Sequence, residues 1–451
     1  MNPHTTGPLA GHDHTTGPDR RRFLALGAAA GAGLLASGCG GTSGPPQAVG
    51  GTYKGSYTGP KVSLTFWNGF TGGDGPYMRS MVKDFNAAHD NIKVTMHTMQ
   101  WEDYYKKVPA AARVGKGPDI GIAHIDQLAT LAARRTVLPL DDVARQLGLK
   151  QSDFAGRVWE AGIYQDERYG IPLDVHALGQ FWNTDVFGEA DLDGPLRDRA
   201  AYGSGLPKLV DAGIEHPFWM PSLWPSRQIF LTLLWQLGGE PFSADGTTAT
   251  FDSGAGVEAL TWQVQQIKKG YSPANVAIDT QYNAFKTGKN AITWDGIWMI
   301  NDLKKSAPDL NWDLATVPKI GDREAVWASS HNLVLMSQPQ PDENKLAASK
   351  AFIDYISSHS VEWAKSGQIP ARNSARESAE FTELPQAAVA EGVDTMRFLP
   401  AVPGIREVVT RTIEEPVNKA VLQQQSPKRA LTSAARAANE LLKENRKKFG
   451  G

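Results

Sequence analysis

Carboxylates lie close to the ends of several segments that are expected to be strands. Asp126 follows AHI, Asp174 lies in PLDVH, and Asp295 lies in TWDGIW. A glycosidase needs two carboxyl groups that flank the scissile bond, one of them with a raised pKa. No pair of carboxylates here has an identifying spacing, and Gly-x-Ser-x-Gly, phosphate-loop and His-Glu-x-x-His motifs are absent. The residues favour binding over catalysis, with an exported carbohydrate-active enzyme as the alternative.

Tryptophan is abundant, and its distribution bears on what could be bound. All 13 tryptophans follow residue 38, and we expect some of them to serve a ligand instead of the core. Flat aromatic rings combined with Asp, Asn, Arg and His at loop tips suit a solute that has apolar faces and many hydroxyl groups. Few charges are clustered, which favours a neutral polyhydroxylated ligand; an amino-sugar, another polyol or a peptide is the alternative.

Residues 20–39, RRRFLALGAAAGAGLLASGC, combine a basic cluster, a short apolar run and the single cysteine, Cys39. An apolar run of about 11 residues rises about 16 Å as a helix, roughly half of a bilayer core. It therefore suits the apolar region of a signal peptide. Arg-Arg-x-Phe-Leu resembles a twin-arginine export signal, and Ala-Ser-Gly-Cys resembles a lipobox. We expect a leader at 1–38 and a lipid on Cys39 that anchors the protein outside the cytoplasmic membrane; a buried N-terminal helix is the alternative.

Length, net charge and cysteine content restrict the possible domain number and functional classes. The length predicts two domains, or one very large domain, after the leader. A formal net charge of −2 argues against a nucleic-acid-binding surface. Once Cys39 is lipidated no thiol remains, which excludes disulfides and cysteine-based metal sites. We expect no cofactor and no metal.

The folded part is predicted to begin after a Gly/Ser/Pro-rich tether at 39–60. Alternation and β-branching predict strands at 61–67, 92–99 and 118–124, and helical spacing predicts helices at 77–89, 101–115 and 127–135. This order indicates a parallel sheet with helices on both faces. Later segments predict strands within 170–183, strand and turn structure at 291–302 and 325–337, and helices at 226–239, 253–270, 343–358 and 427–449.

Several ordered motifs resemble the maltose-binding-protein-like solute receptors of ABC importers, the bacterial extracellular solute-binding protein family 1. The motifs are FNAAHDNIKV, GKGPDI, RYGIPLDVHALGQFWNTDVF, LLWQLGGEPF, AFKTGKNAITWDGIW, and AASKAFIDYISS followed by GQIPAR. The resemblance covers about residues 61–449. It implies an α/β, two-lobe periplasmic-binding-protein-like fold (type II) with three hinge crossovers and a ligand cleft between the lobes. The implied lobes are 61–173 with 330–362, and 174–329 with 363–451.

The resemblance also implies a function and partners. It points to a receptor that binds a sugar, in particular a di- or oligosaccharide, closes about its hinge and delivers the sugar to the permease subunits of an ABC importer. It implies binding without turnover, and we expect a monomer.

In the first lobe, the resemblance implies ligand contacts at strand ends. Asn68 occupies a position that is often a polar sugar contact, although a turn role is the alternative. Phe70 and Thr71 follow on the same loop, and Phe70 replaces an acidic residue of the maltose-binding type. Trp101 is a platform or a packing residue. Asp126 matches a sugar-contacting aspartate, or serves as a helix N-cap, and His124 lies close to an aromatic contact of the family.

The remaining contacts are expected at the crossovers and in the second lobe. His176 matches an acidic family contact, with Asp174 beside it in the hinge. Trp298 matches a sugar platform, which Trp294 and Asp295 precede on the strand end. The other expected contacts are Trp224 and Arg227 near a family contact region, His331 at the second crossover and Arg372 at the third.

Overall fold

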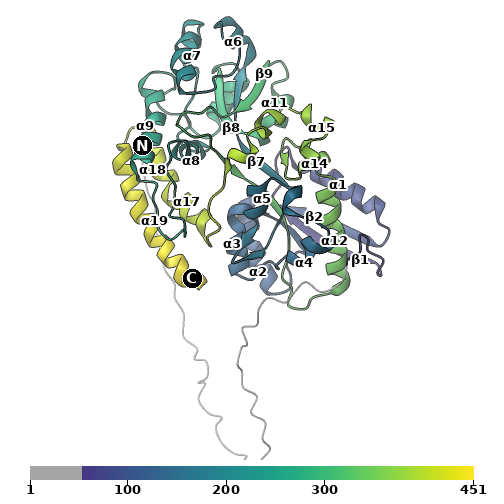
Figure 1. Cartoon of the computed structure of the whole chain (residues 1–451). Coiled ribbons are helices and arrows are strands. Elements are labelled where there is room, and N and C mark those ends of the chain that lie inside the picture. Colours follow the sequence, from purple (N-terminus) through teal and green to yellow (C-terminus); the bar gives the residue numbers. More distant parts are fainter. Residues whose placement is uncertain (1–52, 451) are drawn as a thin grey trace, which may run out of the picture. The chain divides into compact units, whose positions relative to one another are not determined.

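The structure is a computed structural model that describes residues 53–450 (Figure 1). The predicted leader, Cys39 and the first part of the tether lie outside the described residues. Within residues 53–450, no helix is both long enough and apolar enough to cross a bilayer. Two large sheets, the helices packed on them and a small two-stranded sheet make up the described chain.

The first sheet has five strands in the order β2 (Ile92–Thr98), β1 (Val62–Asn68), β3 (Ile120–His124), β11 (His331–Leu335) and β6 (Ile171–Pro172). β1 is parallel to β2 and β3, and β11 is antiparallel to β3 and β6. The helices α1 (Gly75–Ala88), α2 (Trp101–Arg113), α3 (Ile125–Ala133) and α12 (Glu343–Ser358) pack on these strands. Every residue of β3 is buried, as expected of a strand covered on both faces.

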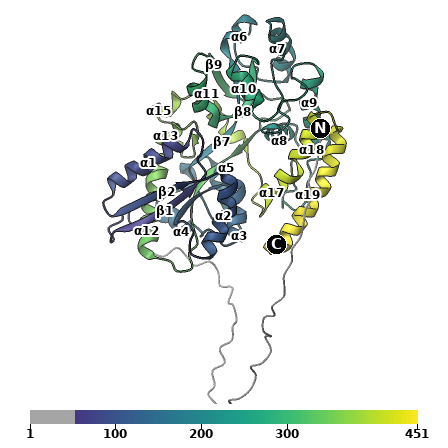
Figure 2. The same cartoon turned by 180° about the vertical axis from the view of Figure 1, so that it is seen from behind.

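The second sheet is built around one long strand, β7 (Asp174–Asn183). Four strands pair with β7 in antiparallel fashion, and β13 (Met396–Arg397) pairs with β10 in parallel. The four strands are β12 (Ile369–Pro370), β10 (Val326–Ser329), β8 (Ile292–Gly296) and β9 (Trp312–Thr316). Its main helices are α8 (Ser226–Gln236), α9 (Gly254–Lys268), α17 (Ile405–Thr412), α18 (Glu414–Val421) and α19 (Pro427–Phe449). The last three pack together, as Figure 2 shows from behind.

Short elements complete the fold. The helices are α4 (Asp141–Gln146), α5 (Gly156–Glu160), α6 (Thr184–Glu189), α7 (Arg199–Asp211), α10 (Thr280–Lys286), α11 (Ile300–Ser306), α13 (Ser360–Ala364), α14 (Asn373–Arg376), α15 (Ala379–Thr382) and α16 (Ala387–Ala390). Three 3₁₀ turns lie at Gln151–Asp153, Ile297–Met299 and Val393–Thr395, and β4 (Ile163–Tyr164) pairs with β5 (Glu167–Arg168).

Most predicted elements are present with small shifts of their ends, and the helix predicted at 427–449 is α19. The strand and turn predicted within 291–302 are present as β8 and the 3₁₀ turn at Ile297–Met299, and α11 begins at Ile300. One local prediction is wrong. The helix predicted from 127 begins at Ile125, so His124 is its N-cap and Asp126 lies in its first turn. Asp126 therefore is not an N-cap, although a carboxylate in a first turn still complements the helix dipole.

The chain passes between the two sheets at three places. β6 leads into β7 across Leu173, β10 leads into β11 across Ser330, and α13 leads into β12. The first two crossings lie next to each other. Ser329, just before the second crossing, pairs with His176 in one sheet, and His331, just after it, pairs with His124 in the other. The ends of strands from both sheets therefore meet in one region.

The carboxylate of Asp174 joins these crossings. It is fully buried, and its Oδ1 accepts hydrogen bonds from the His331 backbone N–H (3.0 Å) and from His176 Nδ1 (3.2 Å). Its Oδ2 accepts from His331 Nδ1 (2.8 Å) and from Trp363 Nε1 on α13 (2.7 Å). Burial opposes ionisation, but His331 and the hydrogen bonds from both histidines hold the pKa of Asp174 below its ordinary value.

We expect Asp174→Asn to lower the free energy of unfolding by about 3 kcal/mol, because the amide nitrogen would face buried donors that need an acceptor. Urea unfolding followed by circular dichroism measures this change. Asp322→Asn is the control, since Asp322 is exposed and its replacement should alter stability by less than about 0.5 kcal/mol. Equal stability of the two variants would show that the Asp174 contacts are energetically unimportant.

Candidate functional site

A cavity of about 490 Å³ lies where the strand ends of both sheets meet. Its volume falls in the range of pockets that enclose a small ligand. The wall includes residues from β3, β7, β11 and the loop after β1, together with residues of α3, α8 and α17. The predicted site residues that line it are Thr71, Trp101, His124, Asp126, His176, Trp224, Arg227, Trp298 and His331.

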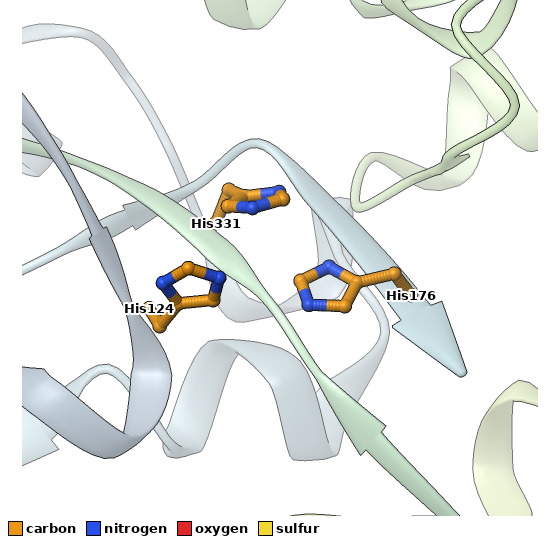
Figure 3. Close-up of side chains that lie close together, drawn as sticks. All are labelled: His124, His176 and His331. Atoms are coloured by element: carbon orange, nitrogen blue, oxygen red, sulfur yellow. The ribbon is translucent and has the colours of Figure 1, made fainter. Parts of the chain in front are cut away.

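Three histidines belong to the cavity wall, and their rings lie close together (Figure 3). Ring centroids are 4.4 Å apart for His176 and His331, 4.7 Å for His124 and His331, and 5.8 Å for His124 and His176. Burial, reinforced by His331, lowers the pKa of both His124 and His176. These two imidazoles are therefore neutral near pH 7 and can both donate and accept hydrogen bonds.

Indole rings provide the apolar part of the wall. Trp224, Trp298 and Trp327 are half-buried neighbours, with ring centroids 6.0 to 6.5 Å apart. Trp101 lies 5.5 Å from His331 in a nearly parallel orientation, with an interplanar angle of 15°. Rings of this kind can cover the C–H faces of a ligand while the polar groups beside them bind its hydroxyls.

Most charged groups of the cavity wall have a charged partner. Arg406 of α17 donates to the Asp126 carboxylate (3.3 Å), and Arg227 of α8 is 3.0 Å from the Glu414 carboxylate. Asp302 accepts from Tyr282 Oη (2.7 Å) and from Lys286 Nζ (3.2 Å). Asp74 differs, because its buried Oδ1 has no hydrogen-bond partner among residues 53–450. Both arginines of the cavity are therefore compensated, and Asp74 keeps an oxygen that can accept a hydrogen bond from a ligand.

Several predicted contacts lie behind the cavity wall. Asn68 is fully buried, and its Oδ1 accepts from the Phe70 N–H and from Thr98 Oγ1, each at 3.2 Å. This is the turn role that was the alternative. Phe70 is also buried and packs against Trp101, His331 and Trp363. Asp174 bonds the two histidines described above. These three residues support the wall instead of forming it.

Three further predicted contacts lie elsewhere, and the structure corrects them. Trp294 is 1% exposed and its Nε1 donates to Tyr202 Oη (2.6 Å), so it belongs to the core. The buried Asp295 accepts from Gln281 Nε2 (3.2 Å). Arg372 donates to Ser357 Oγ (2.9 Å) and lies over the ring of Phe154. Each of these side chains contacts protein neighbours and does not line the cavity.

Other cavity residues were missed by sequence reasoning. They are Gly69, Gly72, Gly73, Asp74, Gln228, Met299, Asp302, Trp327, Ser329, Gln368, Leu399, Arg406, Val409 and Thr410. Trp327 could have been found, because it lies in the segment predicted as strand and turn at 325–337, four residues before His331 at the expected second crossover. Arg406 carries no such signal, since only the packing of α17 against α3 brings it to Asp126.

Comparison with known proteins identifies the family. The profile of the bacterial extracellular solute-binding proteins matches residues 70–363, more than half of the chain. The chain belongs to this family.

Relatives of this solute-binding protein are similar over most of its length. The sn-glycerol-3-phosphate-binding periplasmic protein UgpB of Shigella dysenteriae is 24% identical over 417 residues, covering 85% of this chain and 93% of UgpB. The crystal structure of the cyclic alpha-maltosyl-1,6-maltose binding protein from Arthrobacter globiformis is 23% identical and has a TM-score of 0.72, covering 86% and 100%. The sugar-binding protein MalE of Xanthomonas citri is 20% identical and has a TM-score of 0.76, covering 86% and 99%. The two solved structures confirm the predicted two-lobe, type II fold.

Asp295 gives this solute-binding protein a pH-dependent stability. Burial raises the pKa of Asp295 to about 7, against the opposing hydrogen bonds from the Gly296 N–H and Gln281. The folded state therefore holds this proton more tightly than the unfolded chain. Stability from this group is fully present below about pH 4 and is lost as the pH rises through about 7.

We expect Asp295→Asn to gain stability relative to the unaltered protein as the pH rises from 4 to 8, by on the order of 3 kcal/mol. Urea unfolding at each pH measures the difference. Asp309→Asn, at an exposed position, should show no such trend. A difference between Asp295→Asn and the unaltered protein that stays constant with pH would mean that Asp295 titrates normally.

Proposed function

We propose that this protein is the extracytoplasmic receptor of an ABC importer and that it binds a neutral sugar, in particular a di- or oligosaccharide, in the 490 Å³ cavity. The observation that carries the proposal is the composition of the wall. Indole rings lie beside neutral imidazoles and internally paired charges. A sugar presents flat C–H faces and hydroxyl groups, and both kinds of surface find partners there. The Arthrobacter and Xanthomonas structures are sugar-binding proteins by name, which supports this ligand class.

A phosphorylated polyol is the second candidate because a relative is named for sn-glycerol-3-phosphate binding. A phosphate would require cationic groups that are free to pair with it. Both arginines of the cavity already pair with carboxylates, Arg406 with Asp126 and Arg227 with Glu414. A phosphate would have to displace a carboxylate and leave it in a partly buried place, which is costly. This charge balance favours the neutral sugar.

The proposed binding residues are those that line the cavity, with Trp298, Trp327 and Trp101 as platforms and His124, His176, His331 and Asp126 as hydroxyl partners. The proposed lobes are 61–173 with 330–362, and 174–329 with 363–451. A ligand that contacts both lobes stabilises only the closed arrangement. Closure would then offer a changed surface to the permease. We propose no catalytic step, in keeping with a family of binding proteins.

Export and anchoring are the second part of the proposal. The basic cluster, apolar run and Cys39 occur in the order of a twin-arginine lipoprotein leader. A family of extracellular proteins is consistent with such a leader. Diacylglycerol together with an N-acyl chain supplies the two signals that stable membrane attachment requires. The soluble part would then act as a monomer on the outer face of the cytoplasmic membrane.

We expect Trp298→Ala to weaken sugar binding by at least about tenfold, or about 1.4 kcal/mol. A thermal-shift screen against mono-, di- and trisaccharides, with glycerol 3-phosphate included, first identifies the ligand, and calorimetry then measures its affinity. Trp312→Ala is the control, since Trp312 on β9 does not line the cavity. Unchanged affinity in Trp298→Ala, or a thermal shift with glycerol 3-phosphate alone, would count against the sugar proposal.

We expect Cys39→Ala to release the protein from the membrane into the soluble fraction without unfolding it, because residue 39 precedes the first core residue, Tyr53, by a predicted flexible tether. Membrane fractionation with antibody detection checks this result. The melting temperature of the purified variant serves as the control for folding. Membrane retention equal to that of the unaltered protein would refute the lipid anchor.

A further inference from the structure

We propose that His124, His176 and His331 form a site for a divalent transition-metal ion, with Zn²⁺ as the reference ion, at one end of the ligand cavity. Imidazole nitrogens are preferred ligands of Zn²⁺. Sequence reasoning predicted no metal, because the three histidines are far apart in the chain and show no ligand spacing. The fold brings them together from β3, β7 and β11.

The geometry is close to that of a three-histidine site. One nitrogen from each ring lies within 4.8 Å of a nitrogen of the others, and the rings lie close together (Figure 3). In a tetrahedral site with Zn–N distances of about 2.0–2.1 Å, the nitrogens would lie about 3.3 Å apart. Rotations about the side-chain torsions, with the rings drawn together by up to about 1.5 Å, would therefore complete the site.

Hydrogen bonds behind the rings already prepare them as ligands. The Nδ1 atoms of His176 and His331 bond to the two oxygens of Asp174 at 3.2 and 2.8 Å. Because an ionised carboxylate accepts hydrogen bonds and cannot donate them, both rings carry a proton on Nδ1, and a metal ion would bind at Nε2. A histidine whose second nitrogen donates to a carboxylate is the usual outer arrangement of a zinc ligand.

His124 has an equivalent partner in Tyr105. The Tyr105 hydroxyl lies 2.7 Å from His124 Nδ1 and accepts the His124 backbone N–H at 2.9 Å. With a metal on Nε2, the Nδ1–H of His124 would donate to the second lone pair of this oxygen. Within residues 53–450, every hydrogen bond of the three rings involves Nδ1, so metal binding would break none of them.

The surroundings suit a cation that also meets a ligand. Asp174 brings one negative charge directly behind the site, and Arg406, which also lines the cavity, is paired with Asp126. All three histidines line the cavity, so the remaining coordination position would face the bound solute or water. Three protein ligands with one open position is the arrangement of an exchangeable zinc site. A metal there would also connect the two sheets, since His176 belongs to one and His124 and His331 to the other.

The test is a Zn²⁺ titration of the chelator-treated full chain without any sugar. Calorimetry and competition with a chromogenic chelator give the stoichiometry and the dissociation constant. We expect one Zn²⁺ with a dissociation constant below about 10 µM, in a background where His4, His12 and His14 of the leader are replaced by Gln. His331→Gln and His176→Gln should each weaken Zn²⁺ binding by more than about 100-fold. The loss of a residue that only hydrogen-bonds a metal ligand typically weakens binding by about 10–100-fold.

Matched controls separate this site from surface histidines. His216→Gln removes a ring that bonds the Gly270 carbonyl oxygen. Because His216 does not line the cavity, this change should leave Zn²⁺ binding unchanged. Trp298→Ala should keep Zn²⁺ binding while it loses sugar, so the metal proposal and the sugar proposal fail independently. Circular dichroism checks that each variant is folded.

A spectroscopic measurement on the leader-substituted background protein does not depend on the folding of further variants. Co²⁺ in place of Zn²⁺ should give the visible absorption bands of a four-coordinate nitrogen–oxygen site, and Zn²⁺ should abolish them. Absent bands, a dissociation constant above about 10 µM, or tight binding that persists in both histidine variants would overturn the proposal. In that outcome the three rings serve as hydroxyl partners only.

Discussion

The buried carboxylate of Asp174 is the interaction on which the arrangement of the cavity depends. Four donors converge on its two oxygens: a backbone N–H, two imidazoles and one indole. They come from β7, β11 and α13, so one residue links both sheets at the places where the chain crosses between them. An ionised group without water is stable only when its lone pairs are filled in this way. The same bonds orient the rings of His176 and His331 toward the cavity.

Two ion pairs hold the part of the cavity wall that comes from the helices. Arg406 of α17 reaches Asp126 of α3, and Arg227 of α8 reaches Glu414 of α18. Helix α17 therefore is part of the cavity wall, and α18 supports the wall through Glu414. Because each guanidinium has its own carboxylate, a neutral solute leaves both arginines paired when water is excluded. A ligand that carried charge would have to rearrange these pairs.

The sequence predicts the layers of this fold well and its cavity less well. Alternation in β1 and helical spacing in α1 follow from which residues face the core, and this information is local. The apolar helix α8 carries Trp235, which is buried as its context predicts. The helix that was predicted to begin at 127 begins at Ile125. This error also has a local cause, because the N-cap His124 has extended backbone and makes no side-chain capping bond. By contrast, Arg406 joins the cavity only through the packing of α17 against α3, two segments that are distant in sequence.

Two tryptophans of one motif show where local reasoning ends. Trp294 and Trp298 belong to the same TWDGIW stretch, yet the first packs in the core and the second lines the cavity. The strand ends at Gly296, and a Cβ atom there would collide with the indole ring of Trp298. Gly69 stands in the same relation to Trp101. In both places the missing side chain lets an indole lie against the backbone and face the ligand space. A tryptophan platform in this cavity is thus a pair of residues, the ring and the glycine beneath it, and replacing the glycine would move the ring.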